Sequence, residues 1–403
     1  MALSADSPTL VPPARTGRWV RRVTLLLLLL GLLAGVAWRY RITRPDYRLA
    51  RGLDALRAKD TDRVRAYADR LEASGAADHA HLLRGEALLA LGSPALALVE
   101  FNKIASEGSL RLRAAALSGR CLLELGELRE AHRAFRFVVD EQPDHADAHR
   151  GLAAIAYDLG RLGEAVEHLR RVAELDPQDS RPHRLIGLIY KDLSQDSDAE
   201  AAYRESLRRG GPAALERDVK LGLAEVLARQ TKYADGLKAV EGLPMTTADE
   251  VPNPVSLRAE CLRGLGRPQE AATELDAALP KFPSAELWRL RGQVHQDLAQ
   301  LPEAVKCFER AVELGPQEHR SHYALGQAYS GVGRTEDAAR SFTRVDAIKK
   351  NLDRVSALTQ EAMAKPWDAK VRLELADLSD GMGKPKLAQM WRKAAAACQE
   401  PGR

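Results

Sequence analysis

Two histidines lie four residues apart in the segment "PDHADAH", where His145 and His149 would share one face of a helix. Imidazoles at this spacing can bind Zn²⁺ together, and Asp144 and Asp147 lie close enough to add oxygen ligands. A simpler interpretation is the polar start of a helix, where aspartate caps free backbone N–H groups. Histidine also recurs at one position of a repeat, at His81, His149, His183 and His322. We therefore expect a packing position rather than a metal site.

The rest of the sequence holds no motif of a known catalytic or cofactor site. It contains no Walker A loop, no dinucleotide glycine fingerprint, no HExxH and no nucleophile elbow. Its four cysteines are far apart and form no metal-ligand spacing, so we expect small buried apolar side chains: Cys121, Cys261, Cys307 and Cys398. We predict that the chain is not an enzyme and needs no cofactor.

Composition and charge favour helices and oppose binding of nucleic acid. Of the 403 residues, 45% are hydrophobic but only 5% aromatic, which indicates a core of alanine and leucine between closely packed helices. Residues 1–51 hold nine Arg and two Asp, a net +7, so the total of +4 leaves −3 for the remainder. A slightly acidic body argues against contact with phosphates through bulk charge.

A repeat of about 34 residues dominates the chain. Its clearest mark is a series of small residues: Ala97, Ala131, Ala165, Ala199, Gly236, Ala271, Ala304 and Ala338. A large apolar residue follows each of them by four positions: Phe101, Phe135, Leu169, Tyr203, Val240, Leu275, Phe308 and Phe342. Five positions before, a glycine often occurs: Gly92, Gly126, Gly160, Gly266 and Gly333. Twelve positions after, a proline often occurs: Pro143, Pro177, Pro283 and Pro316.

These positions describe two helices per repeat. Glycine takes the left-handed conformation that ends the first helix, and proline ends the second because it cannot donate within one. The small residue allows close approach of the two helices. One such hairpin cannot bury its apolar face, so the copies must stack. In this arrangement Glu164, Glu167 and His168 are expected to face outward from a second helix.

This pattern resembles the tetratricopeptide repeat (TPR), most closely near Asp147–Gln178 and from His319 onward. The resemblance implies an all-α fold, a right-handed superhelical solenoid of TPR hairpins, and we expect a single transmembrane helix to precede it. We predict a disordered tail (1–18), a transmembrane signal anchor (19–40), a juxtamembrane helix with a degenerate repeat (41–77) and about eight repeats (78–345). A linking helix and a capping hairpin complete the chain (346–403).

The membrane prediction rests on the segment "RWVRRVTLLLLLLGLLAGVAWRYR". Residues 19–40 would form roughly 33 Å of helix, enough for a hydrocarbon core of about 30 Å. The residues on which we base the anchor run from Trp19 to Trp38: Trp19, Val23, Leu25, Leu30, Leu33 and Trp38. Small residues at Gly35 and Ala37 leave open a cleaved signal peptide and a secreted protein.

The sequence only weakly indicates the side of the membrane, because four arginines precede the apolar run 23–38 and four follow it. The free N-terminal amine, and the lack of acidic residues between Asp6 and the span, favour a cytoplasmic N-terminus. We therefore expect a single-pass protein of the inner, cytoplasmic membrane of a bacterium, with its C-terminal body on the outer (periplasmic) side.

The TPR resemblance also implies a binding groove, lined by positions 2, 5, 9 and 12 of each repeat. In the middle repeats these positions carry mostly cations and one tyrosine: Arg120, Arg150, Tyr157, Arg181, Arg184 and Lys191. Arginine suits carboxylates, which favours an acidic peptide or protein segment as partner, although solvated charges on an ordinary helix face explain the same pattern. Position 9 never carries Asn, so the chain lacks the carboxylate clamp of repeats that bind chaperone C-termini.

Three hypotheses of function follow. The first is a membrane-anchored, non-catalytic scaffold that binds partner proteins or peptides in the groove. The second is an assembly or recruitment factor of the bacterial envelope, since an anchored bacterial repeat protein that regulates lipopolysaccharide synthesis is similar in its anchor and repeats; it adds a CxxC pair, whereas this chain has only Cys398 near its end. The third is RNA binding by pentatricopeptide-like hairpins, which the net charge of the body opposes. The oligomeric state stays open.

Overall fold

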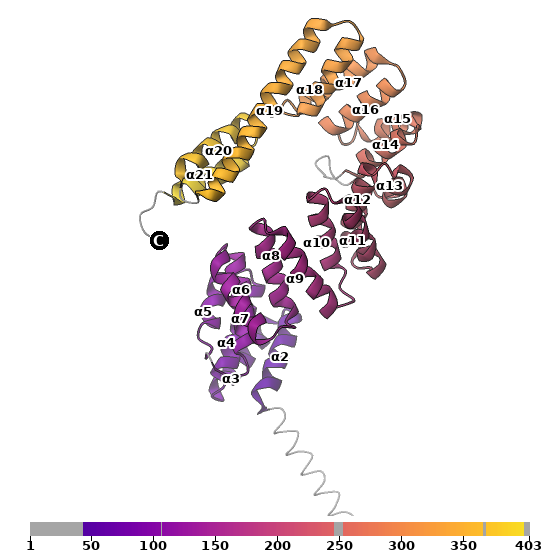
Figure 1. Cartoon of the computed structure of the whole chain (residues 1–403). Helices are drawn as coiled ribbons and strands as arrows, with labels where there is room; N and C mark the ends of the chain where they lie inside the picture. The colour runs from indigo at the N-terminus through magenta and orange to yellow at the C-terminus, as the bar shows by residue number, and fades with distance from the viewer. Residues whose placement is uncertain (1–42, 106, 246–252, 366–367, 399–403) are drawn as a thin grey trace, which may run out of the picture. The chain divides into compact units, whose positions relative to one another are not determined.

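A computed structural model describes residues 43–105, 107–245, 253–365 and 368–398, in which every regular element is an α-helix (Figure 1). The chain divides into two compact units, Met1–Asp176 and Pro177–Arg403. Helices of the first unit are α2 (Pro45–Arg57), α3 (Thr61–Ala73), α4 (Ala77–Ala90), α5 (Pro94–Phe101), α6 (Arg111–Glu124), α7 (Leu128–Glu141), α8 (Ala146–Asp158) and α9 (Leu162–Leu175).

The second unit continues the same alternation of helices. Its members are α10 (Arg181–Asp192), α11 (Asp196–Arg209), α12 (Ala213–Arg229), α13 (Tyr233–Val240), α14 (Pro254–Gly264), α15 (Pro268–Ala278), α16 (Ala285–Asp297), α17 (Leu301–Leu314), α18 (His319–Gly331), α19 (Thr335–Ala364), α20 (Ala369–Gly381) and α21 (Pro385–Ala397). Even-numbered helices are the first helices of their hairpins, and odd-numbered ones are the second. Within each unit, hairpins pack on their neighbours, which confirms the predicted all-α stack of hairpins.

The predicted turn between the two helices of a hairpin is present in every repeat. Gly160 has φ +72°, and the N–H of Arg161 donates to the carbonyl of Ala156 at 2.8 Å, which closes the end of α8. Four turns place a residue other than glycine at the equivalent position, with φ between 57° and 60°: Lys59, Ser194, Thr231 and Ala299. The turn geometry is therefore kept even where the sequence does not mark it.

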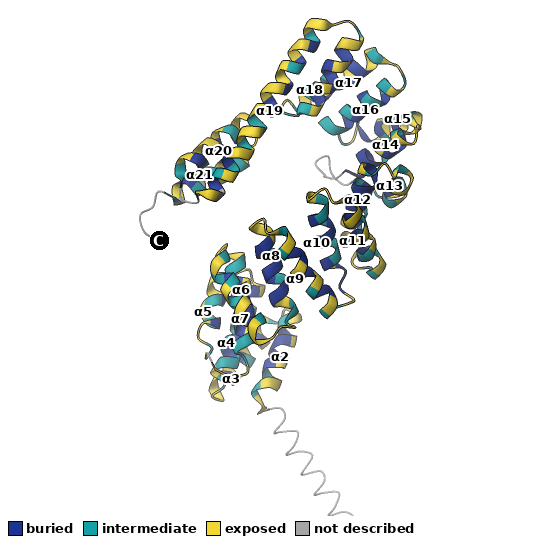
Figure 2. Ribbon diagram, in the orientation of Figure 1, coloured by how far each residue is buried: buried dark blue, intermediate teal, exposed yellow. Residues whose placement is uncertain are grey.

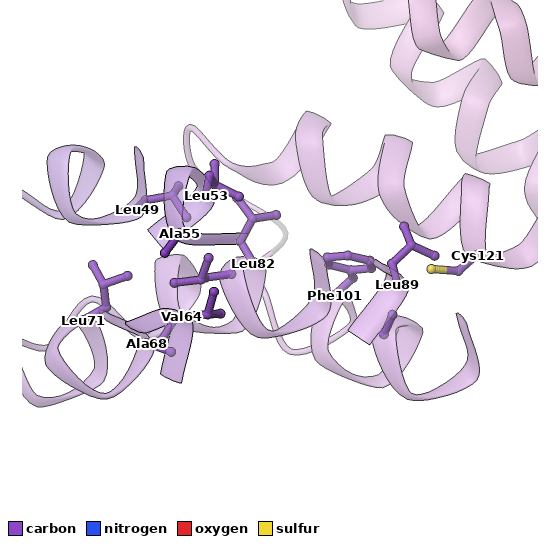
Figure 3. Packing of buried hydrophobic residues seen from close by; sticks show 13 residues of the cluster. Leu49, Leu53, Ala55, Val64, Ala68, Leu71, Leu82, Leu89, Phe101 and Cys121 are labelled. Carbon is purple, nitrogen blue, oxygen red and sulfur yellow. The ribbon is translucent and has the colours of Figure 1, made fainter. Parts of the chain in front are cut away.

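The predicted small and large apolar positions form the core of the hairpins. Ala97, Ala131 and Ala165 are fully buried, and Phe101 and Phe135 are 2% and 3% exposed. Dark-blue positions in Figure 2 follow the sides of the helices that meet within a hairpin and between neighbouring hairpins. Figure 3 shows one such cluster, in which leucines of α2, α3 and α4 pack together and Phe101 lies near Leu89 and Cys121.

Glycines of the first helices make room for the aromatic side chains of the second. The ring of Phe135 in α7 lies between Gly119 of α6 and Gly151 of α8. A Cβ built on Gly119 would lie 2.9 Å from this ring, and one built on Gly151 would lie 2.3 Å from it. Tyr203 has the same relation to Gly187 and Gly222 in the second unit. One aromatic ring thus fixes the spacing of two successive first helices.

Helix lengths differ from the predicted pattern in three places. The second helix of the repeat at His319 and the predicted linking helix form one continuous helix, α19, so the predicted division at 345 and 346 does not correspond to a helix end. The second helices α5 and α13 have only eight residues each, whereas α7 and α9 have 14.

The predicted tail and anchor, with Trp19, Val23, Leu25, Leu30, Leu33 and Trp38, lie outside the described residues. Within the described ranges, each helix is either too short or too polar to span a lipid bilayer.

Introducing glycine at the left-handed turn position and removing it there should change the free energy of unfolding in opposite directions. Ala299→Gly is expected to raise the free energy of unfolding by about 1 kcal/mol, because an L-residue costs ~1–2 kcal/mol in this conformation. Gly333→Ala, at φ +80° in the same unit, should lower it by a similar amount. A Cβ at Gly333 meets no atom within 4 Å, so its cost comes from the backbone alone. Urea denaturation measures both changes, and a shift of the same sign in the two variants would contradict the explanation.

Candidate functional site

The first helices of the first unit enclose a hollow of about 460 Å³, which we name the first-helix groove. It lies among α4, α6 and α8. Its lining comprises Glu86, Arg113, Ala116, Leu117, Arg120, Leu123, Phe135, His145, Asp147, Arg150 and Gly151. Phe135 belongs to α7 and reaches the groove between the two glycines that contact it. The contact that sets the helix spacing is therefore also part of the groove.

Two of the predicted partner-binding residues, Arg120 and Arg150, line this groove together. The third predicted residue of the unit, Tyr157, lies in the last turn of α8 and is 39% exposed. Arg181, Arg184 and Lys191 belong to α10 in the other unit. The structure thus brings Arg120 and Arg150 together in one groove of the first unit. The predicted residues of α10 belong to the second unit.

Carboxylates of the same chain accompany each arginine of the first-helix groove. Arg113 donates to Glu86 at 2.6 Å, Arg120 donates to Glu124 at 3.1 Å, and Arg150 donates to Asp147 at 2.5 Å. Burial raises the pKa of Glu86, although the charge of Arg113 opposes this shift. Sequence reasoning predicted Arg120 and Arg150 at the groove but not these ion pairs. The Arg113–Glu86 pair in particular joins two successive repeats, which only the fold brings together.

In the second unit, the predicted cations of α10 are paired as well. The guanidinium of Arg181 donates to the buried carboxylate of Asp179 at 2.8 and 2.9 Å, so this side chain closes the loop before α10. Lys191 donates to Glu225 of α12 at 2.8 Å and thereby links two neighbouring first helices. Arg184 is half-buried. The positive charge predicted for these side chains of α10 is thus partly neutralised by carboxylates of the chain itself.

The histidines that suggested a metal site have other contacts. Nδ1 of His145 accepts from the backbone N–H of Ala148 at 3.2 Å, so His145, and not an aspartate, caps α8. Nε2–H of His149 donates to the carbonyl of Pro143 at 2.8 Å, and its Nδ1 lies 3.0 Å from Nδ1 of His168. Because Nδ1 of His149 is then the acceptor, His168 donates. The prediction that His168 faces outward is wrong, since this ring holds α9 against α8.

His322 repeats the contact of His149, because its Nε2 lies 3.1 Å from the carbonyl of Pro316. Both rings are at least nine-tenths buried. A histidine at this position therefore links the start of a first helix to the proline that follows the preceding second helix, as expected for a packing position.

The buried cysteines have poorly reactive thiols. Burial raises the pKa of Cys121 to about 11, that of Cys261 to about 12 and that of Cys307 to about 11. Thiolates, not thiols, act as nucleophiles and metal ligands, so these side chains have structural roles. The prediction of buried apolar behaviour is confirmed for these three, whereas Cys398 is only partly buried.

Comparison with known proteins supports the repeat. The tetratricopeptide repeat family matches residues 117–180 and 289–351. Human Superkiller complex protein 3 is 30% identical over 132 residues, 32% of this chain and 8% of that protein. Human Tetratricopeptide repeat protein 13 is 29% identical over 113 residues, 28% of this chain and 13% of that protein. The chain thus matches only a small part of either relative.

Several solved structures resemble the chain at low sequence identity. A tetratricopeptide repeat protein from Parabacteroides merdae has 16% identity and a TM-score of 0.41 over 62% of this chain and 98% of its own. A human IFIT1 dimer with PPP-AAAA has 15% identity and a TM-score of 0.38, covering 89% of this chain and 94% of that one. YrrB, described as a TPR protein with an unusual peptide-binding site, has 17% identity and a TM-score of 0.30 over 54% and 93%.

The stacked hairpins and the family match define a helical-repeat protein. The repeats at 117–180 and 289–351 are tetratricopeptide repeats, and the first of these ranges supplies α8 and part of α6 to the first-helix groove.

The histidine pair should make the stability of the first unit sensitive to acid. Burial, and then the neighbouring His149, lower the pKa of His168 in the folded state. The unfolded chain therefore binds a proton first as the pH falls, and stability is lost from about pH 6.5 downward. His168→Gln keeps a donor for His149 but cannot titrate. Urea midpoints at pH 7.5 and 5.5 should differ less in this variant than in the wild type. An unchanged difference would assign the acid sensitivity to other groups.

Proposed function

We propose that the chain is a non-catalytic scaffold that binds a segment of a partner protein in the first-helix groove. The observation that carries this proposal is the groove itself, about 460 Å³ in volume and formed by three successive first helices. Tetratricopeptide repeats suggest a protein-interaction scaffold, and the repeat match includes α8. Backbone spacing set by Phe135 gives such a groove a fixed width before any partner binds, which lowers the entropy cost of binding.

The charges of the first-helix groove support a partner segment that carries carboxylates. Asp147 and Glu124, which pair with Arg150 and Arg120, have side chains that are 76% and 39% exposed. Exposed ion pairs contribute little to stability, typically about 0–1 kcal/mol, so an incoming carboxylate can replace either at small cost. Bidentate contact of a carboxylate with arginine then gives orientation as well as attraction. Nearby Leu117, Leu123 and Ala116 offer apolar contacts between the charges.

The proposed scaffold is tethered to a membrane by residues 19–40. Support comes from the apolar sequence between Trp19 and Trp38 and from the short distance along the chain to Pro45, where α2 begins. We place the body on the outer side of the inner membrane because the segment before the apolar run 23–38 carries four arginines and no acidic residue after Asp6. In this arrangement the first unit lies nearest to the bilayer along the chain.

A photo-crosslinking experiment tests the groove. A benzophenone amino acid at Leu123, a half-buried residue that lines the groove, should capture a partner protein from the native membrane, whereas the same group at the exposed Arg133 on α7 should not. Adding Arg120→Glu with Arg150→Glu should reduce capture tenfold or more, since reversal of interface charges costs at least about 1.4 kcal/mol, which is a factor of ten.

Arg133→Glu with Arg310→Glu provides the matched control. Both arginines lie on second helices and pair with a glutamate three residues away, at 2.6 Å in each case. Capture should survive in this control. Equal loss in the two double variants would contradict a role for the groove and indicate a general effect of charge.

The same membranes test the tether. Wild-type chain should stay with the membrane after alkaline carbonate extraction, and Leu25→Arg with Leu30→Arg should release it, because each arginine at the middle of a span costs roughly 2.5–3.5 kcal/mol. Protease added to the outer side of intact cells should digest the body. Extraction of the wild-type chain by carbonate would contradict the anchor without affecting the assignment of the groove.

A further inference from the structure

A second groove of the first unit has no lining residue in common with the first-helix groove. It has a volume of about 840 Å³ and lies along α3 and α4, with Glu100 of α5 at its side; we name it the α3–α4 groove. Val64 and Ala68 of α3, at 5% and 1% exposure, form part of its apolar lining, together with Leu88 of α4. Figure 3 shows Val64 and Ala68 at the core cluster of this unit. The groove is of the size that ligand and peptide sites commonly have.

Exposed apolar side chains gather beside this groove. Leu91 is 69% exposed, Leu96 is 58% exposed and Val99 is 53% exposed, the three highest values for large apolar residues in the described parts of the chain. Leu91 lines the groove. Leu96 lies on the same face of α5 as Glu100, one helical turn away, and Val99 is three residues further on. A contiguous apolar patch on a soluble surface usually marks an interaction site.

Most charged groups at the α3–α4 groove are already paired within the chain. Arg57 pairs with Asp54 at 2.9 Å, and Arg84 pairs with Asp69 at 3.1 Å and with Glu72. The two carboxylates at the groove are paired as well. Asp60 lies 3.2 Å from Arg63, and Glu100 lies 2.6 Å from Lys103 and 2.9 Å from His81.

Lys59 and Arg65 are the exception at this groove. Both are exposed, and neither has an acidic side chain within ion-pair distance among the residues that the structure describes. The groove therefore carries two uncompensated positive charges beside an apolar floor. The first-helix groove differs, because each of its arginines has a carboxylate partner.

We propose that the α3–α4 groove binds an amphipathic helix of a partner protein, with leucine-like side chains on one face and acidic residues flanking that face. Apolar anchors at helical spacing would enter between Val64, Leu88 and Leu96, which is the helix-in-groove mode of recognition. Acidic residues of the incoming helix would pair with Lys59 and Arg65. This surface lies on other residues than the first-helix groove, so the scaffold would hold two partner segments at once. The proposal does not depend on the function proposed for the first-helix groove.

The probe is a synthetic amphipathic peptide of about 14 residues, roughly 21 Å of helix, with leucines at i, i+3, i+4 and i+7 and flanking glutamates. A second peptide carries lysine in place of each glutamate, and a third has the glutamate composition in scrambled order. Binding is measured by fluorescence anisotropy with the full chain held in phosphatidylcholine nanodiscs, and empty discs give the background. The glutamate peptide should bind about tenfold or more tightly than either of the others.

Two double variants locate the binding. Leu96→Asp with Val99→Asp should weaken binding of the glutamate peptide about tenfold or more. Lys59→Glu with Arg65→Glu should reverse the preference in favour of the lysine peptide, and it breaks no ion pair of the described chain. Leu314→Asp with Leu373→Asp is the matched control, since these leucines are each 41% exposed and lie in the other unit. Binding should be unchanged in that control.

Several outcomes would overturn the proposal. Equal binding of the glutamate and lysine peptides would exclude recognition of acidic residues. Unchanged binding in both the Leu96/Val99 and the Lys59/Arg65 variants would exclude this groove. Sedimentation that shows a dimer, dissociated by Leu96→Asp with Val99→Asp and insensitive to the peptide, would assign the patch to a second copy of the chain. Binding of anionic vesicles by the patch, with no binding of peptide, would assign it to a lipid surface.

Discussion

The packing of one aromatic ring against two glycines is the contact on which the rest of the structure depends. Phe135 fills the space that Cβ atoms of Gly119 and Gly151 would occupy, at 2.9 and 2.3 Å from the ring. α6 and α8 therefore both pack against the ring of Phe135, which belongs to the second helix between them, α7. This contact buries the apolar face that a single hairpin would expose, and it also sets the width of the first-helix groove.

Charge is distributed differently at the two grooves of the first unit. In the first-helix groove, each arginine pairs with a carboxylate, either on the neighbouring first helix, as in Arg113–Glu86, or within its own helix, as in Arg120–Glu124. A carboxylate of a binding partner must therefore replace a carboxylate of the chain in one of these existing ion pairs. At the α3–α4 groove, Lys59 and Arg65 have no such partner within the described part of the chain, and the adjacent surface is apolar. The first unit, although built from one type of repeat, thus offers two surfaces that favour ligands of different chemistry.

The spacing of residues along the sequence was enough to predict the hairpins, because each repeat uses the same small, large apolar and left-handed positions. Ala131 and Phe135 were predicted and are buried. Thr231 and Ala299 were not recognisable as left-handed turn residues, since tertiary packing imposes that conformation on them. The Arg113–Glu86 ion pair and the contact of His168 with His149 were also missed, because each joins residues on different helices that only the folded chain brings together. Partner-binding roles of Arg120 and Arg150 stay predictions.

Hydrogen–deuterium exchange of a Gly151→Ala variant tests the central claim most directly. The added methyl group must displace the ring of Phe135, so the account predicts faster exchange in both α6 and α8, the helices that this ring joins. Exchange in α16 and α18, in the other unit, should stay as in the wild type. Unchanged protection of α6 and α8 in the variant would contradict the claim that this contact sets the spacing of the first helices.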